Sequence, residues 1–433
     1  MSDSLDTFEE RHVFNIQIVQ PICINHTRGS TWCAEASTLT CYNFEHLMTP
    51  AGIYIHIPFC RSRCSYCDFA TGIYDGDRAE KYVDAVIREI ASWREVNLPV
   101  TVDTIYFGGG TPSLLEPRQL ERILDGIETR VSVAANKEIT IEINPGLVGA
   151  GTTRGTSEEA LREFRRLGIN RASFGAQTFN DRELARLGRS HTAEETRQTF
   201  HSLRRAGFDN VSFDLIAGLP GQTLDGWLQN LEEAFRLQPE HLSFYLLEVH
   251  QGTPLAEHIR RGIQPQPDED LAAAMYEVML ERAVVAGYEH YEISNLCRPG
   301  YDSRHNSKYW SGAPYYGFGC SAHSYDGEVR RWSNERDPAS YVELIANDQP
   351  VITERIELTG SDAYSESIFL GLRLMRGISV KKIQEQFGVD IREEHRQDLD
   401  RFRQAGLLEI DGDLIRLTRQ GALVSNEVFA AFV

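Results

Sequence analysis

The stretch that decides the fold lies at residues 53–67, which read IYIHIPFCRSRCSYC. Residues 53–57 are rich in isoleucine and predict a buried strand. Three thiols, Cys60, Cys64 and Cys67, follow this strand within eight positions. In barrels of parallel strands, the chemistry is placed at the carboxyl ends of the strands. A cysteine loop at this point therefore favours a barrel whose first strand is residues 53–57.

Five further segments have the character of strands, with Gly, Pro or Asn near their ends. They are residues 104–107, 139–143, 171–174, 211–216 and 242–247. Helical patterns fill the gaps, with capping-box signals at residues 156–159 and 192–195 and glycine stops at Gly168 and Gly207. Strands that alternate with helices predict an α/β fold with a parallel sheet. Six units are two short of a closed eight-fold barrel, so we expect a partial (β/α)6 TIM-like barrel.

The pattern changes after residue 250. Residues 267–287 predict a long helix, and residues 407–417 predict a hairpin around the Asp411-Gly412 turn signal. Helices followed by a hairpin indicate a small C-terminal α+β winged-helix-like domain. We expect four parts: a non-native or disordered N-terminal extension (1–47, with translation starting at Met48), the barrel (48–290), a connecting segment (291–350) and the C-terminal domain (351–433).

Composition excludes several classes of protein. The chain has 433 residues, of which 41% are hydrophobic, enough for a substantial core rather than a disordered chain. Its formal net charge of −19 argues against a general binder of nucleic acid or of anionic membranes. No secretory signal precedes the first strand, so we expect a cytoplasmic protein whose cysteines do not form a disulfide framework.

The cysteine loop indicates a metal centre. Three thiolates can hold three irons of a 4Fe–4S cluster and leave the fourth iron open, whereas a closed cluster takes four cysteines. A structural zinc site would also need a fourth ligand at a suitable spacing. Asp68 follows Cys67 directly, so the loop contains no fourth cysteine. Zinc and unligated core thiols remain the alternatives.

The Cys-x-x-x-Cys-x-x-Cys spacing resembles that of the radical S-adenosylmethionine (SAM) superfamily. The resemblance implies that the amino and carboxylate groups of SAM bind the open iron. It also implies that an electron from the cluster can cleave the sulfonium to give a 5′-deoxyadenosyl radical, with the protein supplying orientation and insulation.

The resemblance also assigns SAM-binding residues. A glycine turn at residues 108–112 follows the second strand, where backbone without Cβ lets a ligand approach and exposed N–H groups can bind a carboxylate. Polar residues occur in or after successive strands that are otherwise apolar, which favours a shared ligand over separate loop contacts. The expected SAM-binding residues are Tyr54, Tyr66, Gly109, Gly110, Thr111, Glu142, Gln177, Arg189 and Asp214. Ordinary core packing of the two tyrosines and a solvated Arg189 are the alternatives.

Further motifs narrow the resemblance to the oxygen-independent coproporphyrinogen III oxidase group, over about residues 51–430. They are YIHIPFC at 54–60, GLPGQT at 218–223 and YEISN at 291–295. The group contains decarboxylating oxidases and heme chaperones of the HemW type. The oxidases typically carry another cysteine two positions after the cluster motif, where this chain has Phe69. The sequence HNSKYW at 305–310 matches the His-Asn-x-x-Tyr-Trp motif of the chaperones.

The residue types of this motif suit heme. Imidazole can be an axial ligand of heme iron, and Tyr and Trp present flat faces to a porphyrin. The candidate heme-binding residues are His305, Asn306, Tyr309 and Trp310, with Cys320 and His323 as alternative ligands and Trp332 as a further aromatic. Arg304, Arg330 and Arg331 are candidates for the propionates. The alternative is that His305 only forms hydrogen bonds within the protein and holds Tyr309 and Trp310 in the core.

The resemblance implies a heme chaperone that binds a 4Fe–4S cluster, SAM and heme. It would pass heme to an acceptor hemoprotein, such as a membrane-associated respiratory enzyme. The rival is an oxygen-independent coproporphyrinogen III oxidase, and a cluster-bearing structural protein without a porphyrin ligand is a third reading. Enzymatic activity stays open, although we do not expect coproporphyrinogen III dehydrogenase activity. No nucleic acid partner is expected, and a homodimer is compatible with the resemblance.

Overall fold

The computed structural model describes residues 49–95, 100–146 and 156–433. The predictions for residues 1–47 and for a start at Met48 therefore lie outside the described residues. Within the described ranges, no helix combines the length and the apolar character that crossing a membrane would require.

A twelve-stranded sheet forms the centre of the molecule, in the order β14-β13-β12-β11-β1-β4-β5-β6-β7-β8-β10-β9. Seven neighbouring strands run parallel, namely β11 (Tyr315–Phe318), β1 (Ala51–Ile57), β4 (Thr101–Gly109), β5 (Ser132–Ile143), β6 (Arg171–Gln177), β7 (Val211–Ala217) and β8 (His241–Leu246). Six of them are the predicted strands. The two edges of the sheet do not pair, so the prediction of a partial barrel is confirmed.

The remaining strands extend both edges in antiparallel fashion. They are β9 (Glu289–Glu292), β10 (Asn295–Cys297), β12 (His323–Tyr325), β13 (Arg330–Asn334) and β14 (Ile352–Glu357). Residues 291–350, expected as a connecting segment, thus contribute strands to the central sheet. Strand β11 was not predicted, because four residues that include Gly317 give a weak strand signal on their own. Pairing with β1, where Ile55 lies opposite Phe318, decides its conformation.

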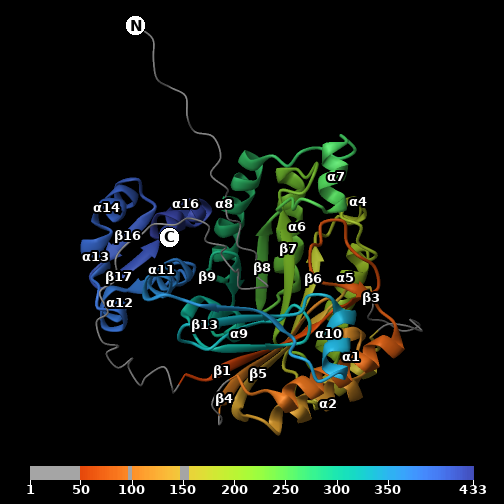
Figure 1. Ribbon diagram of the computed structural model, residues 1–433. Helices are drawn as coiled ribbons and strands as arrows, with labels where there is room; N and C mark the ends of the chain where they lie inside the picture. Colours follow the sequence, from red (N-terminus) through yellow and green to blue (C-terminus); the bar gives the residue numbers. More distant parts are fainter. Residues whose placement is uncertain (1–48, 96–99, 147–155) are drawn as a thin grey trace.

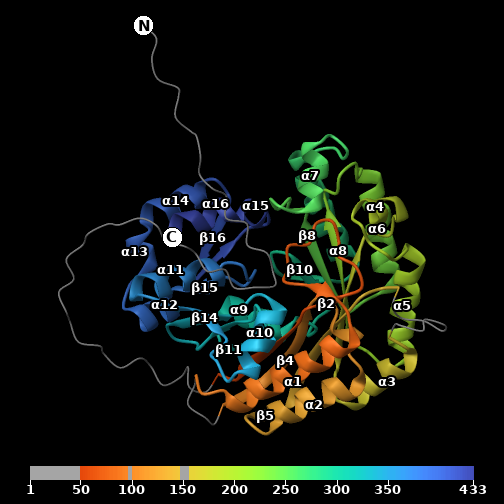
Figure 2. The ribbon, with the colours of Figure 1, turned by 45° about the vertical axis from the view of Figure 1, so that its right-hand side comes forward.

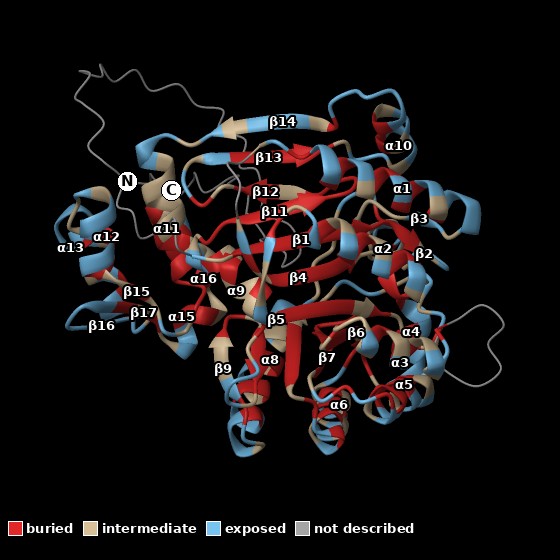
Figure 3. Cartoon of the chain, turned by 90° about the horizontal axis from the view of Figure 1, so that it is seen from below, coloured by how far each residue is buried: buried red, intermediate tan, exposed pale blue. Residues whose placement is uncertain are grey.

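Helices cover the outer face of the sheet (Figures 1 and 2). They are α1 (Gly76–Ser92), α2 (Pro117–Glu128), α3 (Glu158–Arg166), α5 (Ala193–Arg205), α6 (Leu224–Leu237) and α8 (Glu269–Val285). All seven residues of β1 are buried, as parallel strands are when both faces are covered. Figure 3 shows the same division, with buried strands inside and exposed residues on the outer helices.

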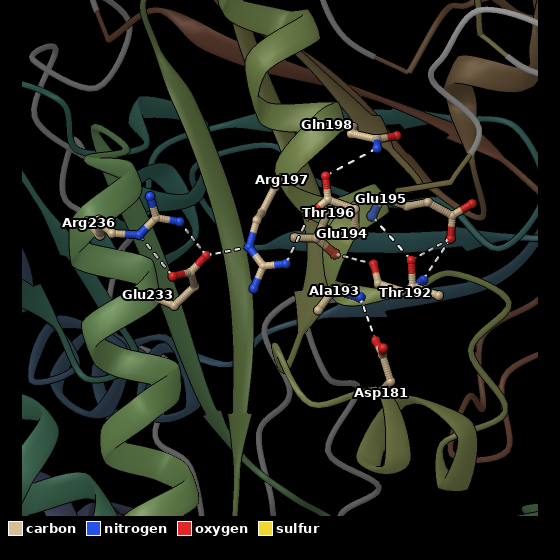
Figure 4. A network of polar contacts seen from close by, with 10 residues as sticks. All are labelled: Asp181, Thr192, Ala193, Glu194, Glu195, Thr196, Arg197, Gln198, Glu233 and Arg236. Atoms are coloured by element: carbon tan, nitrogen blue, oxygen red, sulfur yellow. Dashed lines mark hydrogen bonds and ion pairs between the residues drawn. The ribbon is translucent and has the colours of Figure 1, made fainter.

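Local capping signals set the helix starts. The predicted capping box of α5 is confirmed: Thr192 and Glu195 cap each other, and Asp181 accepts a hydrogen bond from the Ala193 N–H at 2.7 Å (Figure 4). On the same helix, Arg197 pairs with Glu233 of α6. The predicted box at residues 156–159 is wrong, because Ser157 is the N-cap of α3 and bonds the Ala160 N–H.

The C-terminal unit combines helices with the predicted hairpin, which a third strand, β15, extends to a three-stranded sheet in the order β15-β17-β16. Its elements are α11 (Gly360–Gly371), β15 (Ile378–Ser379), α12 (Val380–Phe387), α13 (Ile391–Glu394), α14 (Arg396–Gln404), β16 (Leu408–Asp411), β17 (Leu414–Leu417), α15 (Arg419–Leu423) and α16 (Ser425–Phe429). Asp411 pairs with Leu414, so the hairpin turn is Gly412-Asp413, one position later than the expected pair. The unit packs beside β9, with a backbone bridge between Glu292 and Leu374.

Candidate functional site

A cavity of about 490 Å³ opens at the carboxyl ends of the parallel strands. Two groups of residues line it. The cysteine side contains Cys60, Cys64, Tyr66, Cys67, Gly109, Gly110, Thr111, Glu142, Gln177, Arg189 and Asp214. The C-terminal side contains residues of α8, of the β9–β10 turn and of the C-terminal unit: Asp268, Ala272, Tyr276, Ile293, Ser294, Arg373, Ala422, Leu423, Ser425 and Asn426.

The cysteine loop is held in place by its backbone. The Ser65 N–H donates to the carbonyl oxygen of Leu187 at 3.0 Å, and the Ser65 carbonyl accepts from the Leu255 N–H at 2.8 Å. These contacts leave Cys60, Cys64 and Cys67 half-buried at the cavity wall. Nowhere in residues 49–95, 100–146 and 156–433 do three His, Cys, Asp or Glu side chains gather closely enough for a single metal ion. The three thiols lie together in the lining of the cavity.

Two of the thiols, Cys60 and Cys67, are poorly disposed to ionise by themselves. Burial raises the pKa of Cys60 to about 11, although Thr111 Oγ1 approaches its sulfur at 3.8 Å, and burial also raises the pKa of Cys67. A metal centre that binds thiolates must therefore displace their protons. Arg189 contacts the loop from outside it: its Nη1 lies 3.3 Å from Cys64 Sγ and can offset negative charge on the sulfur.

Arg189 is fixed in the cavity wall rather than solvated. Its Nη2 donates to Asn144 Oδ1 at 2.9 Å and to the Gly175 carbonyl at 2.8 Å. Gly188 before it lies against Ser65, so this arginine and the cysteine loop are positioned together. The surface-charge alternative for Arg189 therefore does not describe this structure.

The glycine turn differs from its expected role. The N–H of Gly109 donates to Glu142 Oε2 at 3.1 Å, that of Gly110 donates to the Ile57 carbonyl, and that of Thr111 donates to the Phe59 carbonyl. These donors are used inside the protein, so they are not free to bind a carboxylate. A Cβ at Gly110 would lie 2.7 Å from the Phe59 carbonyl oxygen. Glycine is required here to pack the turn against β2 (Phe59–Cys60) and to leave bare backbone at the cavity.

Two carboxylates, Glu142 on β5 and Asp214 on β7, line the cavity. Burial raises the pKa of Glu142 to about 7, and the negative charge of Asp214 raises it further. The hydrogen bond that the Tyr106 hydroxyl donates at 2.8 Å acts in the opposite direction and lowers this pKa. Burial raises the pKa of Asp214 to about 6, against its hydrogen bond with Ser243. Gln177 stands beside them with a left-handed φ of 66°, which is uncommon outside glycine and turns its amide back toward Gly175. These groups can recognise a cation and polar hydroxyl or amine groups.

The two expected tyrosines have different positions. Tyr66 lies at the cavity wall, where burial raises its pKa. Tyr54 lies beneath the cavity and not on its wall: its hydroxyl contacts His56 Nδ1 at 3.1 Å, and its ring stacks on Tyr106. Tyr54 is thus packed in the core in this conformation, and its contact with SAM stays a prediction.

The His-Asn-x-x-Tyr-Trp motif forms helix α9 (Arg304–Ser311), which packs on the inner face of the sheet. None of the four candidate heme-binding residues of this motif lines the cavity. The buried carboxylate of Glu138 on β5 accepts from the N–H groups of Arg304 and His305 and so fixes the start of the helix. Asn306 is half-buried on the same helix.

Both ring nitrogens of His305 have partners. Nδ1 lies 2.9 Å from Thr104 Oγ1, and Nε2 lies 2.9 Å from the Tyr309 hydroxyl. Burial lowers the pKa of His305 to about 3, so the ring is neutral. Its ring packs on Tyr106, which in turn bonds Glu142, so His305 supports the cavity from below.

The other heme candidates also lie away from the cavity wall. Arg331 pairs with Glu366 and with the Tyr315 hydroxyl, Arg330 pairs with Asp326, and Arg304 pairs with Asp103. Cys320 is buried beside the Tyr82 hydroxyl, and burial lowers the pKa of His323 to about 4. Trp332 packs on Tyr316.

Sequence reasoning missed the C-terminal side of the cavity. Arg373 lies on its wall, and the guanidinium sits 4.3 Å from the ring centroid of Trp310. Its Nη2 donates to Glu292 Oε1 at 2.8 Å, and Glu292 belongs to the YEISN motif. The motif was the one available signal, but nothing in the sequence connects it with a residue 81 positions away.

Comparisons with known proteins agree with this geometry. The family model of the radical SAM superfamily matches residues 54–234, and that of the HemN C-terminal domain matches residues 358–424. The heme chaperone HemW of Lactococcus lactis subsp. lactis is 34% identical over 89% of this chain and 98% of its own length. The heme chaperone HemW of Bacillus subtilis is 35% identical over 88% of this chain and 98% of its own length.

Among solved structures, that of the coproporphyrinogen III oxidase HemN from Escherichia coli, a radical SAM enzyme, has a TM-score of 0.76. It is 23% identical and covers 89% of this chain and 90% of its own, so it establishes the fold. Membership of the superfamily implies a 4Fe–4S cluster and SAM, and the three half-buried thiols beside a cavity that Glu142, Asp214 and Arg189 help to line fit both. The chain belongs to the radical SAM superfamily and, within it, to the family of the HemW proteins.

Proposed function

We propose that this protein is a heme chaperone, which takes up heme on a radical SAM scaffold and passes it to an acceptor hemoprotein. The observation that carries the proposal is the cysteine side of the cavity: three thiols, bare glycine backbone and buried carboxylates meet at one wall. The relatives named heme chaperone HemW, which match nearly their full length, support the choice of heme as the cargo.

Cys60, Cys64 and Cys67 would hold three irons of the 4Fe–4S cluster. The fourth iron would be left for SAM, because no fourth cysteine follows in the loop. Glu142, Gln177, Arg189 and Asp214 would orient SAM beside Tyr66, over the bare backbone of Gly109, Gly110 and Thr111. When bound, the cluster supplies an electron donor, and the residues of this chain bind the sulfonium nucleoside and exclude water around it.

The axial heme ligand is a separate part of the proposal. His305 is the candidate from the motif, together with Asn306, Tyr309 and Trp310 as contacts to the macrocycle. Ligation by His305 requires its Nε2 to leave the Tyr309 hydroxyl, and the ring is 1% exposed in this conformation. A heme ligand at this residue therefore requires α9 to move away from the sheet.

A paired assay separates the chaperone from its rival, the coproporphyrinogen III oxidase. We expect reconstituted protein with dithionite, SAM and coproporphyrinogen III to give no protoporphyrinogen IX. The same protein mixed with heme should show a Soret shift that saturates with heme. Formation of the porphyrin product, or the lack of a saturable Soret shift, would refute the proposal.

The variant His305→Ala tests the ligand. A changed Soret band at full heme occupancy would assign the iron ligand to His305. An unchanged band would remove His305 from the iron and leave heme uptake intact. Tyr309→Phe is the matched variant, because it removes the partner of Nε2 but keeps the imidazole.

The proposal extends to the acceptor, expected to be a membrane-associated respiratory hemoprotein, and to a cytoplasmic location and a homodimer. Mixing heme-loaded protein with an apo-hemoprotein, followed by separation and spectroscopy, tests transfer. Heme that stays on this chain in the presence of excess acceptor would contradict it for that acceptor.

A further inference from the structure

Arg373 is the cationic group on the C-terminal side of the cavity, and the function above gives it no role. It follows α11 and lies where the C-terminal unit joins β9: the Ile293 N–H donates to the Arg373 carbonyl at 3.2 Å. The residue is 4% exposed, so its charge is almost fully removed from bulk solvent. Burial of a charge is costly unless it is paired, so its partners must be accounted for.

The known partners account for only part of the guanidinium. Glu292 pairs with Nη2 at 2.8 Å, and the face of the group lies over the Trp310 ring. Nε is buried without a hydrogen-bond partner. An unsatisfied donor on a charged group is unfavourable, and such groups in native proteins call for a missing partner.

Glu292 holds Arg373 in this position. The carboxylate is fully buried, and its second oxygen accepts from the Ser294 N–H and from the Asn295 side-chain amide. Three of the five residues of the YEISN motif thus form a rigid carboxylate platform against which the arginine lies. The Trp310 ring, from the His-Asn-x-x-Tyr-Trp motif, packs against the face of the Arg373 guanidinium. Residues of both motifs therefore contact this one side chain.

The charges around the cavity define what Arg373 can bind. Arg189 is engaged with Cys64, Asn144 and Gly175 on the cysteine side. The other charged side chains of the wall are acidic: Glu142, Asp214, Glu248, Asp268 and Glu269. An anionic group of a ligand would be repelled over most of this wall, and Arg373 is the place where it would be accepted.

Resting on the proposed function, we propose that Arg373 binds a carboxylate of the tetrapyrrole, a propionate, on the C-terminal side of the cavity. Guanidinium and carboxylate match in a forked geometry, and the apolar neighbours Ile293, Ala422 and Leu423 offer a flat macrocycle its contact surface. Glu292 is a positioning residue that acts through Arg373. The carboxylate of SAM has the same chemistry, so the test separates the two sources.

The test compares heme with its dimethyl ester, which lacks the propionate charges, on full-length protein with a reconstituted cluster. Spectroscopic titration gives the affinity for each. We expect wild-type protein to bind heme about tenfold or more tightly than the ester, the range of a charged hydrogen bond. Arg373→Gln should lower heme affinity to that of the ester and leave the ester affinity unchanged.

Controls keep the outcome interpretable. Arg204→Gln removes an arginine that pairs with Glu240 outside the cavity, and it should preserve the preference for heme over the ester. The double variant Arg373→Gln/Glu292→Gln leaves a neutral pair and covers the case in which the single variant does not fold. Arg373→Lys should restore part of the preference, because it keeps the charge and loses the fork.

The outcomes separate the two claims. If wild-type protein binds neither porphyrin, the proposed function itself fails. If it binds both equally, or if Arg373→Gln weakens both to the same degree, heme uptake stands and the assignment of Arg373 is overturned. A loss of SAM affinity in Arg373→Gln with an intact preference for heme would assign the residue to the carboxylate of SAM and would also overturn the porphyrin assignment.

Discussion

The cysteine side and the C-terminal side of the cavity are built in different ways. The cysteine side takes its residues from the ends of consecutive parallel strands, from Cys60 after β1 to Asp214 in β7. The C-terminal side takes them from α8, the β9–β10 turn, Arg373, Ala422, Leu423, Ser425 and Asn426, which meet only in the folded chain. Parallel strands must bring their carboxyl ends to one edge, so the first side is encoded by local order. The second side depends on how a separate unit docks.

The largest expected effect is the loss of the cluster, which concerns the cysteine side alone. Cys64→Ala should abolish the visible absorption of the cluster after anaerobic reconstitution, because one iron loses its thiolate and the loop has no spare cysteine. Iron content and absorption spectra measure this. The control is Cys297→Ala, a buried cysteine outside the cavity, which should keep the full spectrum. Equal spectra for the two variants would contradict the ligand assignment.

The next largest effect concerns His305, which lies beneath both sides of the cavity. His305→Ala should lower the free energy of unfolding by about 2–4 kcal/mol, since it removes a buried ring and strands the hydroxyls of Thr104 and Tyr309. Denaturant unfolding of the cluster-free protein measures this. His305→Gln should recover part of the loss by restoring a hydrogen bond. A loss below about 0.5 kcal/mol, the range of a surface substitution, would show that α9 does not support the cavity.

A smaller effect, specific to the cysteine side, depends on pH. The pKa of Glu142 is about 7 in the folded protein, against an ordinary value of 4.5, because burial disfavours the charge. The folded state therefore holds a proton that the unfolded chain has released between these values. Its contribution to stability is full below about pH 4.5 and is lost as the pH rises through 7.

We expect Glu142→Gln to remove this part of the pH dependence, on the order of 1–2 kcal/mol after allowance for its partial exposure to the cavity. Denaturant unfolding of the cluster-free protein between about pH 5 and about pH 8 tests this prediction, because a shift of one pKa unit is worth about 1.4 kcal/mol. Glu281→Gln, on the exposed face of α8, is the control. Its free energy of unfolding should depend on pH with the same slope as that of the wild-type protein. Parallel slopes for wild type and Glu142→Gln would contradict a raised pKa at this residue.

The smallest effect touches the C-terminal side. Tyr276→Phe removes the hydroxyl that donates to the Ile293 carbonyl at 2.7 Å and should cost about 1 kcal/mol of stability. His290 Nε2 also contacts this carbonyl, which limits the loss. The spectrum of the cluster should not change, because Tyr276 belongs to the C-terminal side of the cavity and not to the cysteine side. A reduced cluster yield in this variant would show that the two sides are not independent.

Much of the fold followed from sequence patterns. The six strands and the C-terminal hairpin were predicted because each has a local signal, either a β-rich run or a turn pair. Strand β11 was missed because its conformation is decided by pairing with β1. The box at residues 156–159 was misplaced by one residue, since Thr156 bonds the Ser113 carbonyl instead of capping the helix.

The same division holds for the site. The cysteine spacing and the polar strand ends indicated a shared site for Cys60, Glu142 and Asp214, and the family resemblance added Arg189; all four line one cavity. The sequence could not rank its arginines: Arg330 and Arg331 lie near the heme motif along the chain, yet both pair elsewhere.

Sequence alone determined the three-cysteine loop and the class of barrel, because the residues involved are neighbours in the chain or on adjacent strand ends. Tertiary structure alone decided that His305 is buried under the cavity and that Arg373 faces into it. Both outcomes depend on the packing of α9 and of the C-terminal unit against the sheet. Such packing joins segments far apart in sequence and leaves no periodic signal in either of them.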